Sequence, residues 1–192
     1  MPPKPAGPTL TERRAPWVVF TASGDPWLTS ETAALVRRGG LVLRVDGREL
    51  RDAASVFRTF ARELSFAGYF GHNWDALVDC LQDWHGPGHG RQDLAILIDH
   101  ADGLCEADFL GPLVSALVQA AWHSNLRLDA DGEPDAWRPR VAQHFVFLLD
   151  GAAPAAFAEG AARGADVAVA LADGRLLAAL HPADWPPAPA QA

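Results

Sequence analysis

The chain lacks the features that would place it outside the cytoplasm or in a membrane. Its 192 residues include only two cysteines, Cys80 and Cys105. Two cysteines without an export signal are typical of free or buried thiols in a reducing cytosol. Met1 to Pro16 is rich in proline and has no apolar stretch of the kind found in secretory signals. No run approaches the roughly 18 apolar residues of a membrane span, so a cytoplasmic location is expected.

Positive charge is also scarce. The formal net charge is −8 and the isoelectric point is about 5.2. Direct nucleic-acid binding usually requires a basic patch, so this balance argues against it. An acidic protein is better suited to a basic protein partner, because opposite fields accelerate their encounter. Fifteen of the 16 basic residues are arginine, a bias typical of GC-rich coding that suggests a bacterial origin.

The most informative segment, residues 69–84, combines a predicted helix with regularly spaced carboxylates. Asn73 is a good N-cap residue, and Asp75, Asp79 and Asp83 follow at four-residue intervals. They therefore fall within roughly 80° of one another on one helical face. Such pairs repel by about 0.2–0.5 kcal/mol each, so helix stability does not explain the arrangement. It indicates a face that binds something positively charged.

The surroundings of these carboxylates favour the same interpretation. No Lys or Arg lies between Arg62 and Arg91 to neutralise them. Aromatic residues, which often anchor protein interfaces, flank the stripe at Tyr69, Phe70, Trp74 and Trp84. A solvated helix face with no partner is the simpler alternative.

The string Tyr-Phe-Gly-His-Asn-Trp-Asp-Ala-Leu-Val-Asp-Cys-Leu at residues 69–81 resembles the signature of the barstar family. Members of that family are intracellular inhibitors of the ribonuclease barnase. The match has no gaps, and a tryptophan follows shortly after at Trp84, as in the family pattern. A weaker resemblance extends over roughly residues 40 to 150 and leaves both ends of the chain uncovered.

The resemblance and the alternation of apolar strands with amphipathic helices predict an α/β fold. We expect a barstar-like small parallel β-sheet packed with helices, with N- and C-terminal extensions. Strands are expected at 17–20, 41–45, 94–98 and 144–149, and a hairpin at 167–180. Helices are expected from Thr29 or Ser30 to about 38, and at 53–65, 74–83, 106–122 and 153–163. The predicted organisation is a disordered segment 1–16, an extension 17–40 with a strand and a helix, a barstar-like domain 41–150, a helix and hairpin 151–180, and a disordered tail 181–192.

The resemblance also implies a role for individual residues. Asp79 would occupy the place of an RNA phosphate among basic groups of the ribonuclease, and Asp75 would pair with another basic group. The expected partner-binding set is Asp79, Asp75, Tyr69, Gly71, Asn73, Trp74, Val78, Asp83 and Trp84. The partner would be a basic secreted ribonuclease or ribonuclease-like toxin, bound one to one by a monomer. The resemblance implies that the protein catalyses no reaction and needs no cofactor. It also implies that the protein binds neither nucleic acid nor membrane directly.

Departures from the family pattern keep other interpretations open. The prototype of the family has Trp at the position of Val78 and Glu at that of His72, and its last helix carries acidic residues. Here the stretch from Phe109 onward has no Asp or Glu before Asp129. A different basic partner, such as a non-barnase toxin nuclease or a regulatory protein, is therefore the alternative. A small-molecule enzyme that uses the carboxylates is a third option and would need a concave pocket beside Asp75 and Asp79.

A metal site is not expected. His85 and His89 lie close to Cys80 and Asp83 in the sequence and supply metal-binding residue types. A two-histidine site at this spacing usually lies on a helix, and the intervening Gly-Pro-Gly at 86–88 prevents one. A flexible loop with solvent-facing histidines is the expected structure.

Overall fold

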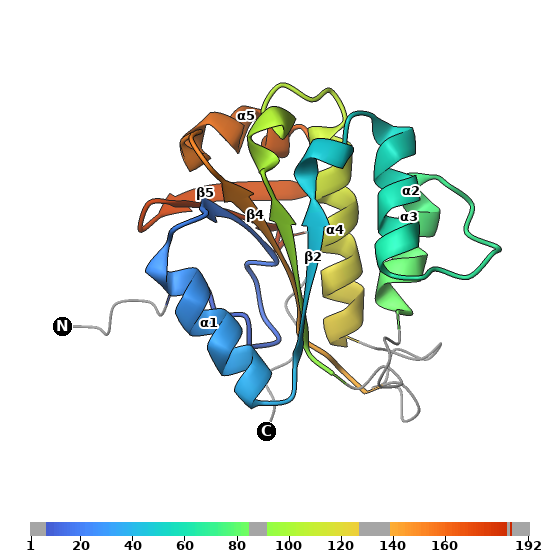
Figure 1. Cartoon of the computed structure of the whole chain (residues 1–192), viewed down its shortest axis with the longest axis horizontal. Coiled ribbons are helices and arrows are strands. Elements are labelled where there is room, and N and C mark those ends of the chain that lie inside the picture. The colour runs from blue at the N-terminus through green and yellow to red at the C-terminus, as the bar shows by residue number, and fades with distance from the viewer. Residues whose placement is uncertain (1–6, 85–91, 127–138, 184, 186–192) are drawn as a thin grey trace.

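The protein forms a single mixed sheet with helices on both faces (Figure 1). The computed structural model describes residues 7–84, 92–126, 139–183 and 185. The strand order is β2-β3-β4-β1-β6-β5. The strands are β1 Val18–Ala22, β2 Leu41–Asp46, β3 Leu94–Asp99, β4 Gln143–Leu149, β5 Val167–Ala172 and β6 Arg175–Leu180.

The first four strands in this order are parallel, and the predicted C-terminal hairpin adds two antiparallel strands. β1 pairs with β4 on one side and with β6 on the other. The strands of both extensions are therefore part of the same sheet as the strands between them. The prediction of an α/β fold with a barstar-like sheet and helices is confirmed.

The helices separate into two groups by the face they cover. The α-helices are α1 Pro26–Arg37, α2 Ala53–Glu63, α3 Trp74–Gln82, α4 Leu110–Leu126 and α5 Ala158–Ala162, with short 3₁₀ turns at Gly47–Glu49, Ala101–Leu104 and Pro154–Phe157. α1 buries Leu28 and Leu35 against one face of the sheet. α2, α3 and α4 pack on the other face around the larger core (Figure 1). Within the described residues, no helix has the length and apolar character to cross a bilayer.

The predicted start of α1 was wrong. Thr29 and Ser30 lie inside the helix, and Asp25 is its N-cap. The Asp25 carboxylate accepts a hydrogen bond of 2.9 Å from the Trp27 backbone N–H. Pro26 occupies the first helical position, where its fixed φ is favourable and its missing N–H costs nothing.

The N-terminal segment is ordered from residue 7 onward, contrary to the prediction of disorder. Leu10 is fully buried under α1. The Glu31 carboxylate accepts hydrogen bonds from the Thr9 hydroxyl at 2.8 Å and the Leu10 N–H at 2.9 Å. The Trp27 indole N–H donates to the Pro8 carbonyl at 2.7 Å. Residues 1–6 lie outside the described part.

Two other segments fall largely outside the described residues. Residues 129–140 are described only at their last two positions. In the predicted disordered tail, Trp185 is placed with its ring 4.8 Å from that of Trp122. The backbone N–H of Trp185 donates to His181 O at 2.9 Å. The chain is thus packed against α4 at residue 185 rather than disordered there.

Candidate functional site

Helix α3 begins where the sequence predicts it, and it carries the acidic face toward solvent. The Asn73 side chain caps the helix by accepting a bond of 2.8 Å from the Ala76 N–H. Leu77 and Leu81 are fully buried in the main core, whereas Asp75 and Asp79 are exposed. The leucines and the carboxylates lie on opposite faces of α3. Burial of the leucines in the core therefore turns the carboxylates toward solvent.

Asp83 and Trp84 terminate the helix rather than continue it. Asp83 is the C-cap and is half-buried. The Trp84 indole N–H donates to the Leu64 carbonyl at 2.7 Å. This bond ties the end of α3 to the end of α2, so Trp84 has a structural role whether or not it also contacts a partner.

The aromatic residues around α3 differ in what they do. Tyr69 is 86% exposed and is one of few large hydrophobic side chains left open to solvent among the described residues. Phe70 is buried, with ring contacts to Phe57 and Phe66. The Trp74 ring lies edge-on to Phe57 at 4.8 Å. Of the four aromatic residues that flank the carboxylates in the sequence, only Tyr69 is exposed, whereas Phe70 and Trp74 belong to a packed aromatic cluster.

The turn that leads into α3 is tightly packed at Gly71. A Cβ at Gly71 would come within 3.3 Å of the Ala76 Cβ and of the Asn73 amide nitrogen. His72, the next residue, has a left-handed backbone with φ of 49°. The compact turn thus brings the exposed Tyr69 and the N-cap of α3 to the same region of the surface.

An open groove of about 690 Å³ runs beside α3. Three carboxylates line it, those of Glu63, Asp79 and Asp83, together with the aromatic rings of Phe66, Tyr69 and Trp84 and parts of Leu43, Leu64, Ser65, Ala67 and Cys80. Asp75 is not among the lining residues. Asp79 and Asp83 therefore form a wall of the groove, and Asp75 lies outside it. The acidic face of α3 is neither wholly convex nor a pocket that encloses both Asp75 and Asp79.

The carboxylates of Asp75 and Asp79 make no ion pair within the described part of the chain. Asp79 accepts one hydrogen bond, of 3.3 Å, from the Gln82 side-chain amide. A carboxylate can accept about four hydrogen bonds, so most of the capacity of Asp79 is available to water or to a partner. The repulsion between neighbouring carboxylates would be relieved by a cation placed in the groove.

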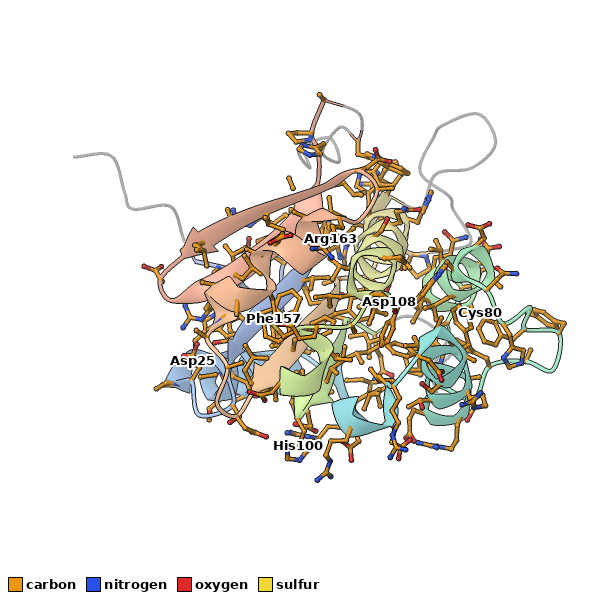
Figure 2. All side chains as sticks on the ribbon, turned by 90° about the horizontal axis from the view of Figure 1, so that it is seen from above. Asp25, Cys80, His100, Asp108, Phe157 and Arg163 are labelled. Atoms are coloured by element: carbon orange, nitrogen blue, oxygen red, sulfur yellow. The ribbon has the colours of Figure 1, made fainter. Side chains whose placement is uncertain are left out.

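Cys80 on α3 (Figure 2) is the only thiol in the groove lining, and its surroundings make it a poor nucleophile. Burial raises the pKa of the Cys80 thiol, and the negative charges of Asp79 and Asp83 raise it further. The thiolate is the reactive form of cysteine. The arrangement therefore keeps this group protonated and chemically quiet.

The structure brings the predicted partner-binding residues into two adjoining groups. Tyr69, Asp79, Asp83 and Trp84 line the groove, while Gly71, Asn73 and Asp75 lie at the N-terminal end of α3. Trp74 and Val78 are half-buried and pack against the main core. Sequence reasoning did not select Glu63, Phe66 or Leu43 as groove residues.

The predicted absence of a metal site concerns mostly residues outside the described part, since His85 and His89 both lie there. Among the residues that the structure places, no group of three or more histidine, cysteine, aspartate or glutamate side chains is arranged to hold a metal ion.

A comparison with protein-family models agrees with the resemblance seen at residues 69–84. The model described as Barstar (barnase inhibitor) matches residues 41–127. The matched residues span β2, α2, α3, β3 and α4, with the turns between them, and include every groove residue named above. Residues 41–127 are therefore similar to the barstar family. Strands β1, β4, β5 and β6 and helix α1 lie outside the match.

The N-cap of α3 offers a direct test of how the site is positioned. Replacing Asn73 by alanine is expected to lower the free energy of unfolding by about 1 kcal/mol, because the Ala76 N–H loses its acceptor. Urea unfolding followed by circular dichroism measures the loss. Asn73→Asp retains a capping oxygen and is the matched control, so an equal loss in both variants would show that the cap is not what stabilises the helix.

Proposed function

We propose that the protein inhibits a basic, barnase-like ribonuclease by binding one to one and covering its active site with the acidic face of α3. Asp79 would stand in for a substrate phosphate. The observation that carries this proposal is the exposed Asp79 carboxylate in the wall of an acidic groove, within the segment that matches the barstar family.

The charge distribution supports a cationic partner side chain at this position. A carboxylate and an arginine guanidinium can form two parallel hydrogen bonds, and these are stronger than bonds between neutral groups. Asp79 and Asp83 face the same groove. The groove is also lined by Phe66, Tyr69 and Trp84, whose rings suit a guanidinium, which stacks on aromatic faces.

Chemistry at the groove gives little support to an enzyme. The groove has a concave shape beside Asp79, as a small-molecule enzyme would need. Burial and the neighbouring carboxylates raise the pKa of its one thiol, that of Cys80, and the Glu63 carboxylate already pairs with Arg62 at 2.7 Å. A binding role requires no reactive thiol.

A different basic partner remains the second candidate, and one observation favours it. Helix α4 has no acidic residue along its length and is buried at most positions. It therefore cannot add the acidic contacts that the last helix of the family supplies. A toxin nuclease that engages mainly α3 and the groove would fit this narrower surface, and in either case the protein would act in the cytoplasm as an antidote.

The test is a titration of the full chain into an RNA-cleavage assay with a barnase-type ribonuclease. We expect cleavage to stop at one equivalent. The association rate should fall steeply as ionic strength rises, because encounter is guided by charges that salt screens. Stopped-flow measurement at low and high salt gives the rate.

The two candidates separate in the same experiment. Stoichiometric inhibition with salt-dependent association supports the ribonuclease inhibitor. If the ribonuclease remains fully active at a large excess of the chain, the first proposal fails. A panel of basic toxin nucleases then tests the second candidate with the same assay.

A further inference from the structure

His144 on β4 is a titratable side chain that lies buried beneath the N-terminal segment. It is 1% exposed. Residues 9–16, which we call the N-terminal strap, pass over its ring. Neither His144 nor any residue of the strap lines the acidic groove. An inference about this contact is therefore independent of the proposed ribonuclease inhibition.

Both nitrogens of the imidazole ring face carbonyl oxygens of the strap. Nε2 lies 2.8 Å from Glu12 O, and Nδ1 lies 3.1 Å from Pro16 O. A carbonyl oxygen can only accept a hydrogen bond, and a neutral imidazole carries one N–H. Neutral His144 therefore donates to one carbonyl of the strap and faces the other without a bond.

The other end of the strap is attached to α1. The Glu31 carboxylate accepts hydrogen bonds from the Thr9 hydroxyl and the Leu10 N–H, and the Leu10 side chain is fully buried. The strap thus runs from a carboxylate of α1 to a histidine of β4. Of these two types of group, histidine is the one that ordinarily changes its charge between pH 5 and pH 8.

The charged side chains around the ring come from three parts of the chain. Asp93, which precedes β3, and Glu31 on α1 favour the protonated ring through their negative charges. On the strap, the Arg13 Nε lies 3.9 Å from the Asp93 carboxylate and offsets part of that charge. Glu12 and Arg14, also on the strap, form an ion pair with each other.

Burial opposes protonation of the ring more strongly than these groups favour it. Burial lowers the pKa of His144 below its ordinary value of 6.5, and the contacts with Glu12 O and Pro16 O and the two carboxylates offset this only in part. The physical reason is that a buried imidazolium loses its hydration. Docking of the strap, which covers the ring, therefore favours the neutral histidine.

We propose that the strap is an acid-released cover, which stays docked while His144 is neutral and detaches from β4 when that ring takes up a proton. Detachment returns the imidazolium to water. A histidine whose pKa is lower in the docked state makes that state less stable as the pH falls below the ordinary value of 6.5. Mild acidification would thus free residues 9–16 for other contacts.

Hydrogen exchange of the Leu10 amide measures docking of the strap, because this N–H is bonded to the Glu31 carboxylate in the docked state. Protection factors of the ¹⁵N-labelled full chain are compared at pH 7.5 and pH 5.5, each corrected for the intrinsic exchange rate. Leu10 protection is expected to fall about 5- to 10-fold, as the uptake of one proton on opening requires. Protection that is unchanged or higher at pH 5.5 would overturn the proposal.

The Ile96 amide, in the middle of β3, distinguishes release of the strap from unfolding of the whole chain. Ile96 should stay far better protected than Leu10 at both pH values, because the strap opens while the sheet remains intact. Equal protection of the two amides would mean that the strap leaves only when the protein unfolds, and the proposal would fail.

Two variants assign the pH dependence to its cause. His144→Gln keeps a side-chain N–H that can donate to Glu12 O and removes the titrating ring, so Leu10 protection should be the same at both pH values. His100→Gln is the matched control, because it removes an exposed histidine at the opposite end of β3 from Asp93. The loss of protection should persist in His100→Gln, and a loss that also persists in His144→Gln would contradict the proposal.

The ring signals of His144 in the wild-type chain keep the test decisive if His144→Gln does not fold. Followed by NMR over the same pH range, they should titrate with a midpoint below 6.5. A midpoint above 6.5 would mean that protonation tightens the strap through a second bond, to Pro16 O, and would overturn its release by acid.

Discussion

Replacing Asp79 by alanine is expected to weaken inhibition of a barnase-type ribonuclease by at least about 2 kcal/mol, or roughly 30-fold in Kd. Interface hot spots cover about 2–8 kcal/mol, and the upper end of that range comes from an acidic residue of the barnase–barstar pair itself. The reason is the exposed carboxylate in the groove wall, which has only one weak hydrogen bond within the described chain. Its removal leaves the partner's basic groups buried and unpaired. Inhibition titrations give the Kd of each variant.

Two further variants separate the fixed carboxylate from the overall charge. Asp79→Asn keeps the shape and loses the charge, and its effect should approach that of Asp79→Ala. Asp108→Ala also removes one negative charge, from an exposed residue outside the groove (Figure 2), and should change the Kd by less than about 0.5 kcal/mol. Equal losses for Asp79→Ala and Asp108→Ala would mean that net charge, rather than a positioned phosphate mimic, drives binding.

The elements with strong periodicity could be predicted from sequence. In α2 the apolar residues recur at helical spacing, and the helix forms at Ala53–Glu63 with Val56 and Phe60 fully buried. The acidic face of α3 followed in the same way from Asn73 and the four-residue spacing. These predictions succeeded because each depends on only two things, the spacing of residues within one helix and which face of that helix packs against the core.

The N-terminal segment could not be predicted because its partners are distant in sequence. Leu10 is one apolar residue in a proline-rich stretch, and nothing nearby indicates that it is buried. It is held by the carboxylate of Glu31, 21 residues away. The ring of buried His144, more than 120 residues away, lies 2.8 Å from Glu12 O and 3.1 Å from Pro16 O. Composition indicated disorder, and tertiary contacts overrode it.

The sequence pattern predicted the groove residues on α3 but not those that other elements contribute. Asp79 and Asp83 come from one periodic pattern, so they were found together. Glu63 comes from α2 and Leu43 from β2, and only the packing of three elements places them opposite α3. A groove is a property of how elements meet, and the sequence pattern of any one of them does not contain it.

Replacing Arg175 by methionine is expected to lower the free energy of unfolding at neutral pH by about 3 kcal/mol. The Arg175 guanidinium donates to the Asp25 carboxylate at 2.6 and 2.8 Å, and the two side chains are only 13% and 14% exposed. Arg175 also lies over the Trp27 ring at 4.9 Å. The pair joins the N-cap of α1 to the C-terminal hairpin, so its loss leaves a nearly buried carboxylate without its counter-charge. Urea unfolding measures the change.

The loss should depend on pH in a defined direction. Burial opposes ionisation of Asp25, but hydrogen bonds from Arg175, Thr21 and the Trp27 N–H outweigh it, so the pKa of Asp25 lies below its ordinary value of 3.8. A lowered pKa stabilises the folded state above pH 3.8, and that contribution disappears as the pH falls through the folded-state pKa. The gap between wild type and Arg175→Met should therefore be full at pH 7 and shrink below about pH 4. Arg163→Met is the matched control, because Arg163 pairs with Glu159 at 67% and 85% exposure and should cost no more than about 0.5 kcal/mol. If Arg175→Met cost as little as Arg163→Met, the N-terminal and C-terminal extensions would not be held to each other by this ion pair.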